Sequence, residues 1–371
     1  MRKYNETLRK ISLGISIIFK PFFRKKNSFL DCAAPKTILV IELHKLGDVV
    51  LIIPLLQFLR KKYPKSKIIF LGPTFSEDIM TGQNIYDELV KFDAFWVTKS
   101  KFKFIEDLAL IYNLIRNLRK KNIDLTIDIR GDFRNILIAH LSNSKSIIGY
   151  GSTGGDYLLS NNLDTNSTLQ HLSFHIKKVI DFLNSNSEEF YYKPSIKLTN
   201  IEIIECKFIE QYIGINYIGS NDLRSLDFNT LEKLLKTILE FNARVVVFLS
   251  PNSGNELNTF IDKFNAKNLC NVEVVSLPLR NYITYLSRAV YLINVDSGPA
   301  HLAAALGIPQ TTIFGPNEPK IVKPISEKVF IIFNQSLDCR PCNQIHCTNT
   351  EYKKCLSDIK LVNIINPKYI L

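Results

Sequence analysis

The sequence predicts an α/β protein of two domains, each built on a parallel sheet with helices on both faces. Three observations support this prediction. Continuous apolar runs of strand length alternate with longer helical segments, which is typical of parallel sheets buried on both sides. The alternation occurs in the first half of the chain and again in the second. The chain has 371 residues, enough for two hydrophobic cores.

The first half begins with KTILVIEL, a β-branched apolar run at 36–43 that predicts a strand. A helix is expected at 49–64, where Pro54 should bend it. The next expected elements are a strand at 67–72, a helix at 102–121 and a strand at 123–131. Residues 142–170 are rich in Gly, Ser and Asn, so we expect a loop there.

The second half contains five apolar runs that predict strands, at 212–219, 243–250, 271–277, 290–296 and 309–315. Helices are expected between them, at 228–240 and 255–266. The polar stretch 185–210 separates the two halves. The predicted domains are therefore 37–200 and 201–371, preceded by an arm at 1–36. Ligands of such sheets bind at the carboxyl ends of the strands.

The positive charge of the chain is concentrated in the arm. The formal net charge is +12, and residues 1–36 contribute +7 of it through nine Lys or Arg and two acids. The remaining +5 (12 minus 7) is ordinary for a protein of this size. The sequence has no helix-turn-helix, RNA-binding or zinc-finger signature, so no nucleic-acid partner is expected.

Apolar side chains recur at helical spacing within the arm, between basic residues: Leu8, Ile11, Ile15, Ile18 and Phe22. This pattern is typical of an interfacial helix on an anionic membrane, which predicts peripheral membrane contact through residues 1–30. A helix packed on the protein body and a poorly ordered tail fit the pattern equally well. No apolar run reaches the ~18 to 20 residues that a membrane-spanning helix needs.

A polar turn between a predicted strand and a predicted helix is the most informative feature of the second half. It lies in VDSGPAHLAAALG (295–307), and its residues of interest are Asp296, Ser297, Gly298 and His301. The first turn of a helix presents unpaired N–H groups, and Gly298 would let an anion approach the backbone. The turn could therefore hold a diphosphate, with Asp296 accepting from sugar hydroxyls and His301 donating to phosphate oxygens. The alternative is an ordinary helix start capped by Asp296 or Ser297.

The first half contains a comparable turn in ELHKLGDVV (42–50). Asp48 lies where the first strand passes into the first helix, at the carboxyl edge of the predicted sheet. A carboxylate there could act as a general base. The alternative is an N-cap for a helix that begins at Val49, which would favour an Asp equally.

Taken together, the two turns resemble glycosyltransferase family 9, the bacterial lipopolysaccharide heptosyltransferase family. The matching segments are ILVIELHKLGDVVLIIPLLQFLRKKYPKSKI near the start and DSGPAHLAAALGIPQTTIFGPNEP near the end. The resemblance runs from Thr37 to the C-terminus. It implies the GT-B fold, in which two Rossmann-like domains face each other across a cleft.

The resemblance also implies an activity and a location. Family members transfer a sugar with inversion from a nucleotide diphosphate donor, typically ADP-heptose, to a growing glycolipid. The expected acceptor is a lipopolysaccharide core or a related glycolipid, so the expected location is cytoplasmic, peripheral to the inner membrane. The chain has no evident Asp-x-Asp metal motif, and neither a metal nor another cofactor is expected for the reaction.

The resemblance assigns the catalytic base to Asp48 and the donor-binding turn to the residues named above in 295–307. The segment INYIGSNDLRSLD (215–227) occupies the place of the family's donor-phosphate loop. Its candidate donor-binding residues are Ser220, Asn221 and Arg224. This loop departs from the family pattern in having Tyr217-Ile218 and no Trp after the basic residue, which leaves the identity of the donor open.

Three further residues are candidates by the same resemblance or by position. Glu256 resembles the family's ribose-binding acid, although a carboxylate favoured by the helix dipole explains it equally. Arg130 and Arg134, in DIRGDFRN, could contact acidic groups of the acceptor. A solvated helix start is the alternative interpretation of both arginines.

Four of the seven cysteines are clustered near the C-terminus, in the pattern C-x2-C-x4-C-x7-C: Cys339, Cys342, Cys347 and Cys355. The cluster is compatible with a structural zinc site, but one pair alone has the ideal ligand spacing. Reduced thiols or a disulfide are the alternatives, and a cytoplasmic location argues against the disulfide.

The competing function is that of a non-transferase GT-B protein, such as a sugar-nucleotide epimerase or a nucleotide-sugar-binding module. Asp48 favours the transferase, because a binding module needs no base at that position. An epimerase would be expected to carry further acids and a histidine, which are not found at matching positions.

Overall fold

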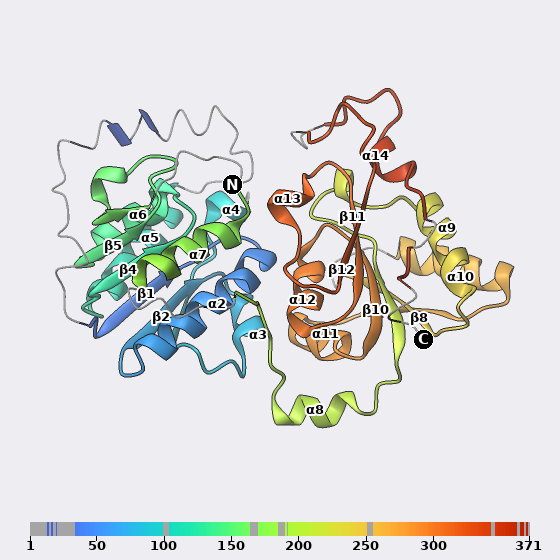
Figure 1. Cartoon of the computed structure of the whole chain (residues 1–371), viewed down its shortest axis with the longest axis horizontal. Helices are drawn as coiled ribbons and strands as arrows, with labels where there is room; N and C mark the ends of the chain where they lie inside the picture. The colour runs from blue at the N-terminus through green and yellow to red at the C-terminus, as the bar shows by residue number, and fades with distance from the viewer. Residues whose placement is uncertain are drawn as a thin grey trace. The chain divides into compact units, whose positions relative to one another are not determined.

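The computed structural model describes residues 13–14, 16–17, 20, 34–98, 104–163, 170–184, 190, 192–250, 255–342, 346–361, 364–366 and 369. The chain divides into two compact units, Met1–Tyr192 and Lys193–Leu371. Each unit contains a six-stranded sheet, and all the paired strands in both sheets run parallel (Figure 1). The α/β class predicted from the alternation of strands and helices is confirmed.

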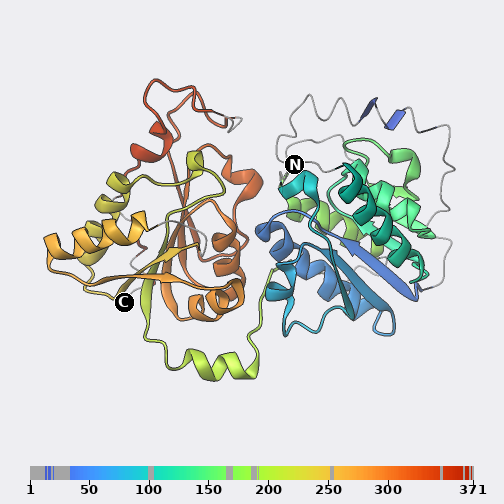
Figure 2. The ribbon, with the colours of Figure 1, turned by 180° about the vertical axis from the view of Figure 1, so that it is seen from behind.

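The first unit alternates strands and helices along its length. Its strands are β1 (Thr37–Ile41), β2 (Lys67–Gly72), β3 (Glu88–Lys91), β4 (Leu125–Asp128), β5 (Ser146–Gly149) and β6 (Asn161–Asn162). Its helices are α2 (Leu46–Lys62), α3 (Ser76–Met80), α4 (Phe95–Thr98), α5 (Phe104–Arg119), α6 (Phe133–Leu141) and α7 (Leu172–Leu183), with a 3-10 turn η3 (Asp156–Leu158). Helices α2 and α7 cover one face of the sheet (Figure 1), and α5 covers the other, as seen from behind (Figure 2).

The second unit repeats this pattern after helix α8 (Asn200–Cys206). Its strands are β7 (Tyr212–Asn216), β8 (Val245–Leu249), β9 (Val272–Ser276), β10 (Ala289–Val295), β11 (Gln310–Phe314) and β12 (Val329–Phe333). Its other helices are α9 (Phe228–Leu239), α10 (Glu256–Asn268), α11 (Leu279–Leu286), α12 (Gly298–Leu306), α13 (Pro319–Val322) and α14 (Lys354–Ser357), with a 3-10 turn η4 (Asp222–Arg224).

The strand order of the two sheets is the same when the strands are counted within each unit. The first sheet has the order β3-β2-β1-β4-β5-β6, and the second has β12-β11-β10-β7-β8-β9. In each sheet the order changes direction between the first and fourth strands, β1 and β4 or β7 and β10. Loops that leave the carboxyl ends of strands on either side of such a switch point diverge, and ligands bind in the space between them.

The central strands are apolar and fully buried, which fixes the sheets within the core. Ile38, Leu39, Val40 and Ile41 of β1 each expose 0% of their surface, and every residue of β7 and β11 is buried. Burying such side chains contributes about 1.5 to 3 kcal/mol each. The polar residues that follow these strands therefore extend from rigid supports.

The loop predicted at 142–170 is wrong, because β5, η3 and β6 lie within it. The β5 strand is buried along its whole length but has only four residues, and the surrounding Gly, Ser and Asn dominate the composition. The strands β3 and β12 were also not predicted. Helix α2 begins at Leu46, three residues before the expected start at Val49.

The arm predicted at 1–36 lies mostly outside the described residues, including its apolar stripe. Ser16 is described and is 3% exposed. Its hydroxyl accepts a hydrogen bond from the Gly155 amide at 2.8 Å, and the Tyr157 hydroxyl donates to the Ser16 carbonyl at 2.8 Å. At this residue, therefore, the arm packs on the first unit. Within the part of the chain that the structure describes, no helix combines the length and apolar character needed to cross a membrane.

Candidate active site

Asp48 lies in the first turn of α2, which follows β1. Its Oδ2 accepts a hydrogen bond from the Lys45 backbone amide at 3.2 Å, as in a capping box. Asp48 was alternatively expected to be the N-cap of a helix that begins at Val49. This is wrong, because the helix begins at Leu46, so Lys45 is the N-cap and Asp48 is the third helical residue. The side chain of Asp48 is 13% exposed, so it keeps limited access to solvent.

Arg130, which follows β4, lies against Asp48. Its Nη1 is 3.3 Å from Asp48 Oδ1, and its side chain is 14% exposed. Burial lowers the pKa of Arg130, but the carboxylates of Asp48, Glu42, Asp128 and Asp132 outweigh it and raise the pKa overall. The guanidinium is therefore always charged, and it favours the ionised form of Asp48 that a general base requires.

Two buried acids beside Arg130 were missed in the sequence. Glu42 follows β1 and is 0% exposed, with Oε1 accepting from the His44 amide at 2.9 Å. Asp128 ends β4 and accepts from the Gly131 amide at 2.8 Å and from Asn135 Nδ2 at 3.0 Å. Burial raises the pKa of Asp128 to about 7. A carboxylate at the end of an apolar strand was the available signal for both.

The turn after β4 is shaped by a glycine. Gly131 has a φ of +65°, and a Cβ placed there would lie 2.7 Å from the carbonyl oxygen of Tyr150. A larger residue would therefore not fit this turn.

Arg134, in the first turn of α6, pairs bidentately with Asp132, with Nε to Oδ1 at 2.8 Å and Nη2 to Oδ2 at 2.5 Å. Its guanidinium also lies 5.1 Å from the centre of the Trp96 ring. Arg134 is 38% exposed, so it is the more accessible of the two arginines proposed for the acceptor.

The polar turn of the second unit lies between β10 and α12. Asp296 follows β10 and is 5% exposed, and His301 is the fourth residue of α12 and is 8% exposed. Ser297 is the N-cap of α12, but its hydroxyl donates back to the Val295 carbonyl at 3.0 Å and accepts from Asn216 Nδ2 at 3.2 Å. The Ser297 side chain is thus used at the end of the strand, which leaves the helix start suited to an anion.

Arg224 connects the loop after β7 to this turn. Its side chain is 4% exposed, and Nη2 donates to Asp296 Oδ2 at 2.5 Å and to the Asp296 carbonyl at 2.6 Å. Nη1 donates to Ser220 Oγ at 2.8 Å. Candidates 72 residues apart in the sequence are therefore in direct contact. Because the pair is buried, removing one partner would cost about 3 to 5 kcal/mol.

Asn317 is a further residue of this half-site that the sequence did not single out. It follows β11 in the segment GPNEP, and its Nδ2 donates to Asp296 Oδ2. Oδ2 of Asp296 thus accepts hydrogen bonds from both Arg224 and Asn317. These two bonds use part of the acceptor capacity that the carboxylate was expected to offer to sugar hydroxyls. The signal was again a polar side chain that follows a buried strand.

The remaining donor candidates lie on the same loop or near it. Asn221 is the N-cap of η4, and its carbonyl accepts from the Arg224 amide at 3.1 Å and from Ser225 Oγ at 3.0 Å. Glu256 is exposed in the first turn of α10. Burial raises the pKa of Tyr217, and the charge of Glu256 raises it further. The charge of Glu256 therefore acts on Tyr217, the residue that follows β7.

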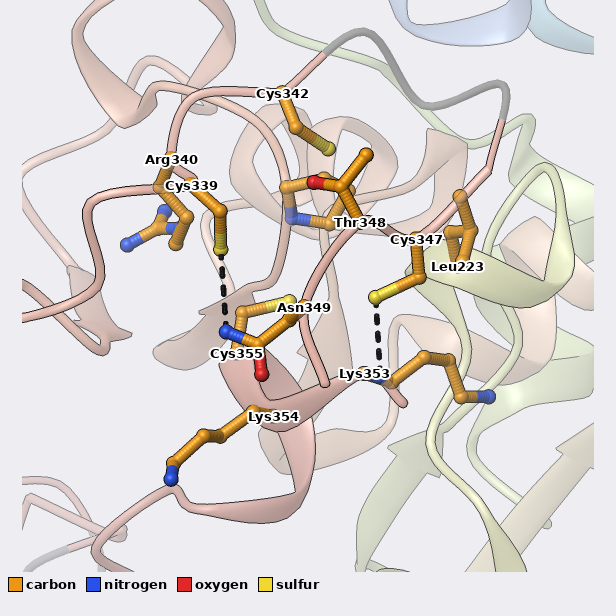
Figure 3. Close-up of a pocket in the computed structure, with 11 residues that line it drawn as sticks. Leu223, Cys339, Arg340, Cys342, Cys347, Thr348, Asn349, Lys353, Lys354 and Cys355 are labelled. Carbon is orange, nitrogen blue, oxygen red and sulfur yellow. Dashed lines mark hydrogen bonds between the residues drawn. The ribbon is translucent and has the colours of Figure 1, made fainter. Parts of the chain in front are cut away.

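The four clustered cysteines line one pocket of the second unit (Figure 3). All four are free thiols of intermediate exposure. Within the described ranges, no group of three or more His, Cys, Asp or Glu is placed to hold a metal ion. Burial raises the pKa of Cys355 to about 11, partly offset by Arg340 and reinforced by the other three thiols.

Comparisons with known proteins identify the chain's family and relatives. The model of glycosyltransferase family 9 (heptosyltransferase) matches residues 111–353. The chain is 24% identical over 295 residues to lipopolysaccharide heptosyltransferase 1 of Campylobacter coli, covering 75% of this chain and 83% of that protein. It is 22% identical over 309 residues to the lipopolysaccharide core heptosyltransferase OpsX of Haemophilus influenzae, covering 78% and 82%.

Two solved structures are similar in fold. The ADP-heptose LPS heptosyltransferase II of E. coli superimposes with a TM-score of 0.69 at 18% identity, covering 88% of this chain and 96% of that chain. The E. coli heptosyltransferase WaaC with ADP gives a TM-score of 0.64 at 17% identity, covering 80% and 92%. These similarities place the two parallel sheets in the fold class of those enzymes.

Proposed function

Because the chain belongs to glycosyltransferase family 9, we propose that it transfers a heptose from ADP-heptose to a lipopolysaccharide core or a related glycolipid. The names of the curated relatives support the class of acceptor. The ADP in one similar structure supports the nucleotide. The proposed place of action is the cytoplasmic face of the inner membrane.

The observation that carries the proposal is the contact between Asp48 and Arg130. The Arg130 guanidinium favours the charged form of the carboxylate beside it, and the position of Asp48 in the first turn of α2 holds the carboxylate in one orientation. In the proposed reaction, Asp48 removes the proton from an acceptor hydroxyl while that oxygen attacks the anomeric carbon of the donor. A single displacement of this kind inverts the anomeric configuration.

The second unit supplies the donor half of the proposed reaction. As the bond between the anomeric carbon and the diphosphate breaks, negative charge grows on the diphosphate oxygens. The helix start at Ser297 and Gly298, together with His301, would stabilise that charge. Arg224 holds Asp296 beside this turn, and Ser220 and Asn221 complete the loop.

The remaining proposed contacts are those with the donor ribose, the acceptor and the membrane. Glu256 would accept hydrogen bonds from the ribose hydroxyls, since its charge acts on Tyr217, which precedes the donor loop. Arg134 would contact acidic groups of the acceptor with the exposed part of its guanidinium. Arg130 is the other arginine proposed for the acceptor, and it would also support Asp48, whose Oδ1 lies 3.3 Å from its Nη1. The basic arm at 1–36 would hold the enzyme near anionic lipid.

The test is incubation with ADP-heptose, with and without a glycolipid that has an unglycosylated core. Transfer predicts that ADP is released only when the acceptor is present, and that the acceptor mass increases by one heptose. ADP release without acceptor would indicate hydrolysis. A changed donor sugar without ADP release would indicate an epimerase and would refute the proposal.

A further inference from the structure

The cysteine-bearing segment after β12 packs against both loops that carry the donor half-site. We call residues 337–342 and 346–357 of this segment the clasp. Arg340 and Lys353 of the clasp line the same pocket as Leu223, which lies on the η4 turn between Asp222 and Arg224 (Figure 3). The clasp and the η4 turn are therefore in contact, although about 130 residues separate them in the sequence.

Lys353 makes the principal contact with the first loop. Its side chain is 7% exposed, and its ammonium donates to Asp222 Oδ1 at 2.9 Å, to the Asp222 carbonyl at 3.2 Å and to the Ser225 carbonyl at 3.2 Å. All three donors of the ammonium are thus directed at one short turn. The adjacent Tyr352 hydroxyl donates to Asp222 Oδ2 at 2.5 Å. The hydrogen bonds from Tyr352 and Lys353 lower the pKa of Asp222.

The backbone of Lys353 is also held in an uncommon conformation. Its φ is +55°, in the left-handed region that residues other than glycine rarely adopt. The Lys353 amide donates to Cys347 Sγ at 3.4 Å, which ties this conformation to the thiol pocket (Figure 3). Such a conformation persists where the surrounding contacts fix it.

Arg340 holds the second loop. Its guanidinium donates to the carbonyls of Gly315 and Asn317, the latter at 2.9 Å, and the Cys342 amide donates to the Pro316 carbonyl at 3.1 Å. This loop carries the Asn317 side chain that donates to Asp296. The clasp therefore contacts the backbone of both loops whose side chains, Arg224 and Asn317, donate to Asp296 Oδ2.

We propose that the clasp is a positioning device for the donor half-site and that Lys353 is its main positioning residue, acting through Arg224. Lys353 fixes the carbonyls on either side of Arg224, so the guanidinium meets Asp296 in one orientation. Without the ammonium, two backbone carbonyls and a carboxylate would lose their buried partner, and the turn would move. This inference rests on the proposed function, because it assumes that the half-site binds a nucleotide diphosphate.

The test is ADP binding to the full-length protein by isothermal titration calorimetry, well below the melting temperature. Lys353→Met removes the ammonium with little change of shape, and we expect it to weaken ADP binding ~10-fold. Lys236→Met is the matched control, because the Lys236 side chain is 51% exposed and pairs with Glu232 of α9, outside the clasp. It should change ADP affinity by less than about twofold.

A double-mutant cycle separates positioning from a general loss of stability. If Lys353 acts through Arg224, Lys353→Met should weaken ADP binding less than about twofold in an Arg224→Lys background. Fully additive effects, or a Lys353→Met variant that binds ADP like wild type, would overturn the inference while leaving the proposed function intact. If the wild type itself binds no ADP, the proposed function fails and this inference fails with it.

A second variant keeps the test available should Lys353→Met not fold. Tyr352→Phe removes one hydrogen bond to Asp222 from a side chain that is 62% exposed, so folding should be preserved. We expect ADP binding to weaken by about two- to fivefold, in line with the loss of one hydrogen bond to a charged group. Unchanged affinity in this folded variant would also overturn the inference.

Discussion

Replacing Asp48 with Asn separates the two roles that the structure gives this residue. Asn keeps the shape, and its side-chain oxygen can still accept from the Lys45 amide, which Asp48 contacts at 3.2 Å. The ion pair with Arg130 is lost. Asp48 and Arg130 are 13% and 14% exposed, so the pair lies between exposed pairs, worth up to ~1 kcal/mol, and fully buried ones, whose breaking costs ~3 to 5 kcal/mol.

The neighbours of Arg130 place the expected cost near the lower end of that range. Glu42, Asp128 and Asp132 also act on its guanidinium, so the charge does not become uncompensated in the variant. We therefore expect Asp48→Asn to lower the free energy of unfolding by about 1 kcal/mol. Transfer should fall ~100-fold or more, because Asn cannot accept the proton. ADP affinity should stay unchanged, since Asp48 belongs to the other unit.

The assay is ADP release in the presence of acceptor, measured alongside thermal melting and ADP titration. Asp124→Asn is the matched control in the same unit. Asp124 precedes β4 and accepts from the Lys36 and Thr37 amides at 2.8 and 3.0 Å, at the amino edge of the sheet. This control should lose stability but keep transfer. An Asp48→Asn variant that folds, binds ADP and transfers at a rate near wild type would refute the assignment of the base.

Three further changes have separate readouts. His301→Ala should weaken ADP binding by ~1 to 3 kcal/mol, the range for losing a charge-assisted hydrogen bond. An unaltered affinity by calorimetry would mean that the start of α12 is an ordinary helix start that does not bind the diphosphate. Because burial raises the pKa of Asp128 to about 7, the wild type should lose stability as the pH rises from ~4 to ~7, where the unfolded carboxyl ionises first. Asp128→Asn has no carboxyl at this position and lacks this loss. The melting temperature of the variant minus that of wild type should therefore be larger at pH 8 than at pH 5. The same difference at both pH values would contradict the argument that burial raises the pKa of Asp128. Replacing Arg24, Lys25 and Lys26 with Gln should reduce sedimentation with anionic vesicles without a change in melting, and undiminished binding would exclude this basic run as a membrane contact.

The sequence allowed the fold class to be predicted because buried parallel strands leave a simple signal. Runs such as the one that forms β1 are continuously apolar and are followed by longer helical segments. The strand β5 has four residues between polar and glycine-rich stretches, and β6 has two, so composition favoured a loop there. These short strands are stabilised by pairing with neighbours, which local sequence does not reveal.

The candidate site was predictable where a polar residue follows a strand and not where its partner is distant. Asp48 and Asp296 were found from their place between strand and helix. The contact of Asp296 with Arg224 and Asn317 depends on the switch point between β7 and β10, which follows from the strand order rather than from any local motif. The contact of Arg130 with Asp48 depends in the same way on the pairing of β1 with β4.

The strand order has a practical consequence for experiments on this chain. Each sheet draws its six strands from one uninterrupted stretch of sequence. On one side of the junction, the Tyr192 hydroxyl donates to the Leu51 carbonyl at 2.6 Å, and on the other, the Ile196 amide donates to the Ala305 carbonyl at 3.0 Å. A cut between Tyr192 and Ile196 would leave both anchors in place and would separate no strand from its sheet. Chimaeras that pair each half with the complementary half of a relative would then assign sugar choice and acceptor choice to one polypeptide or the other.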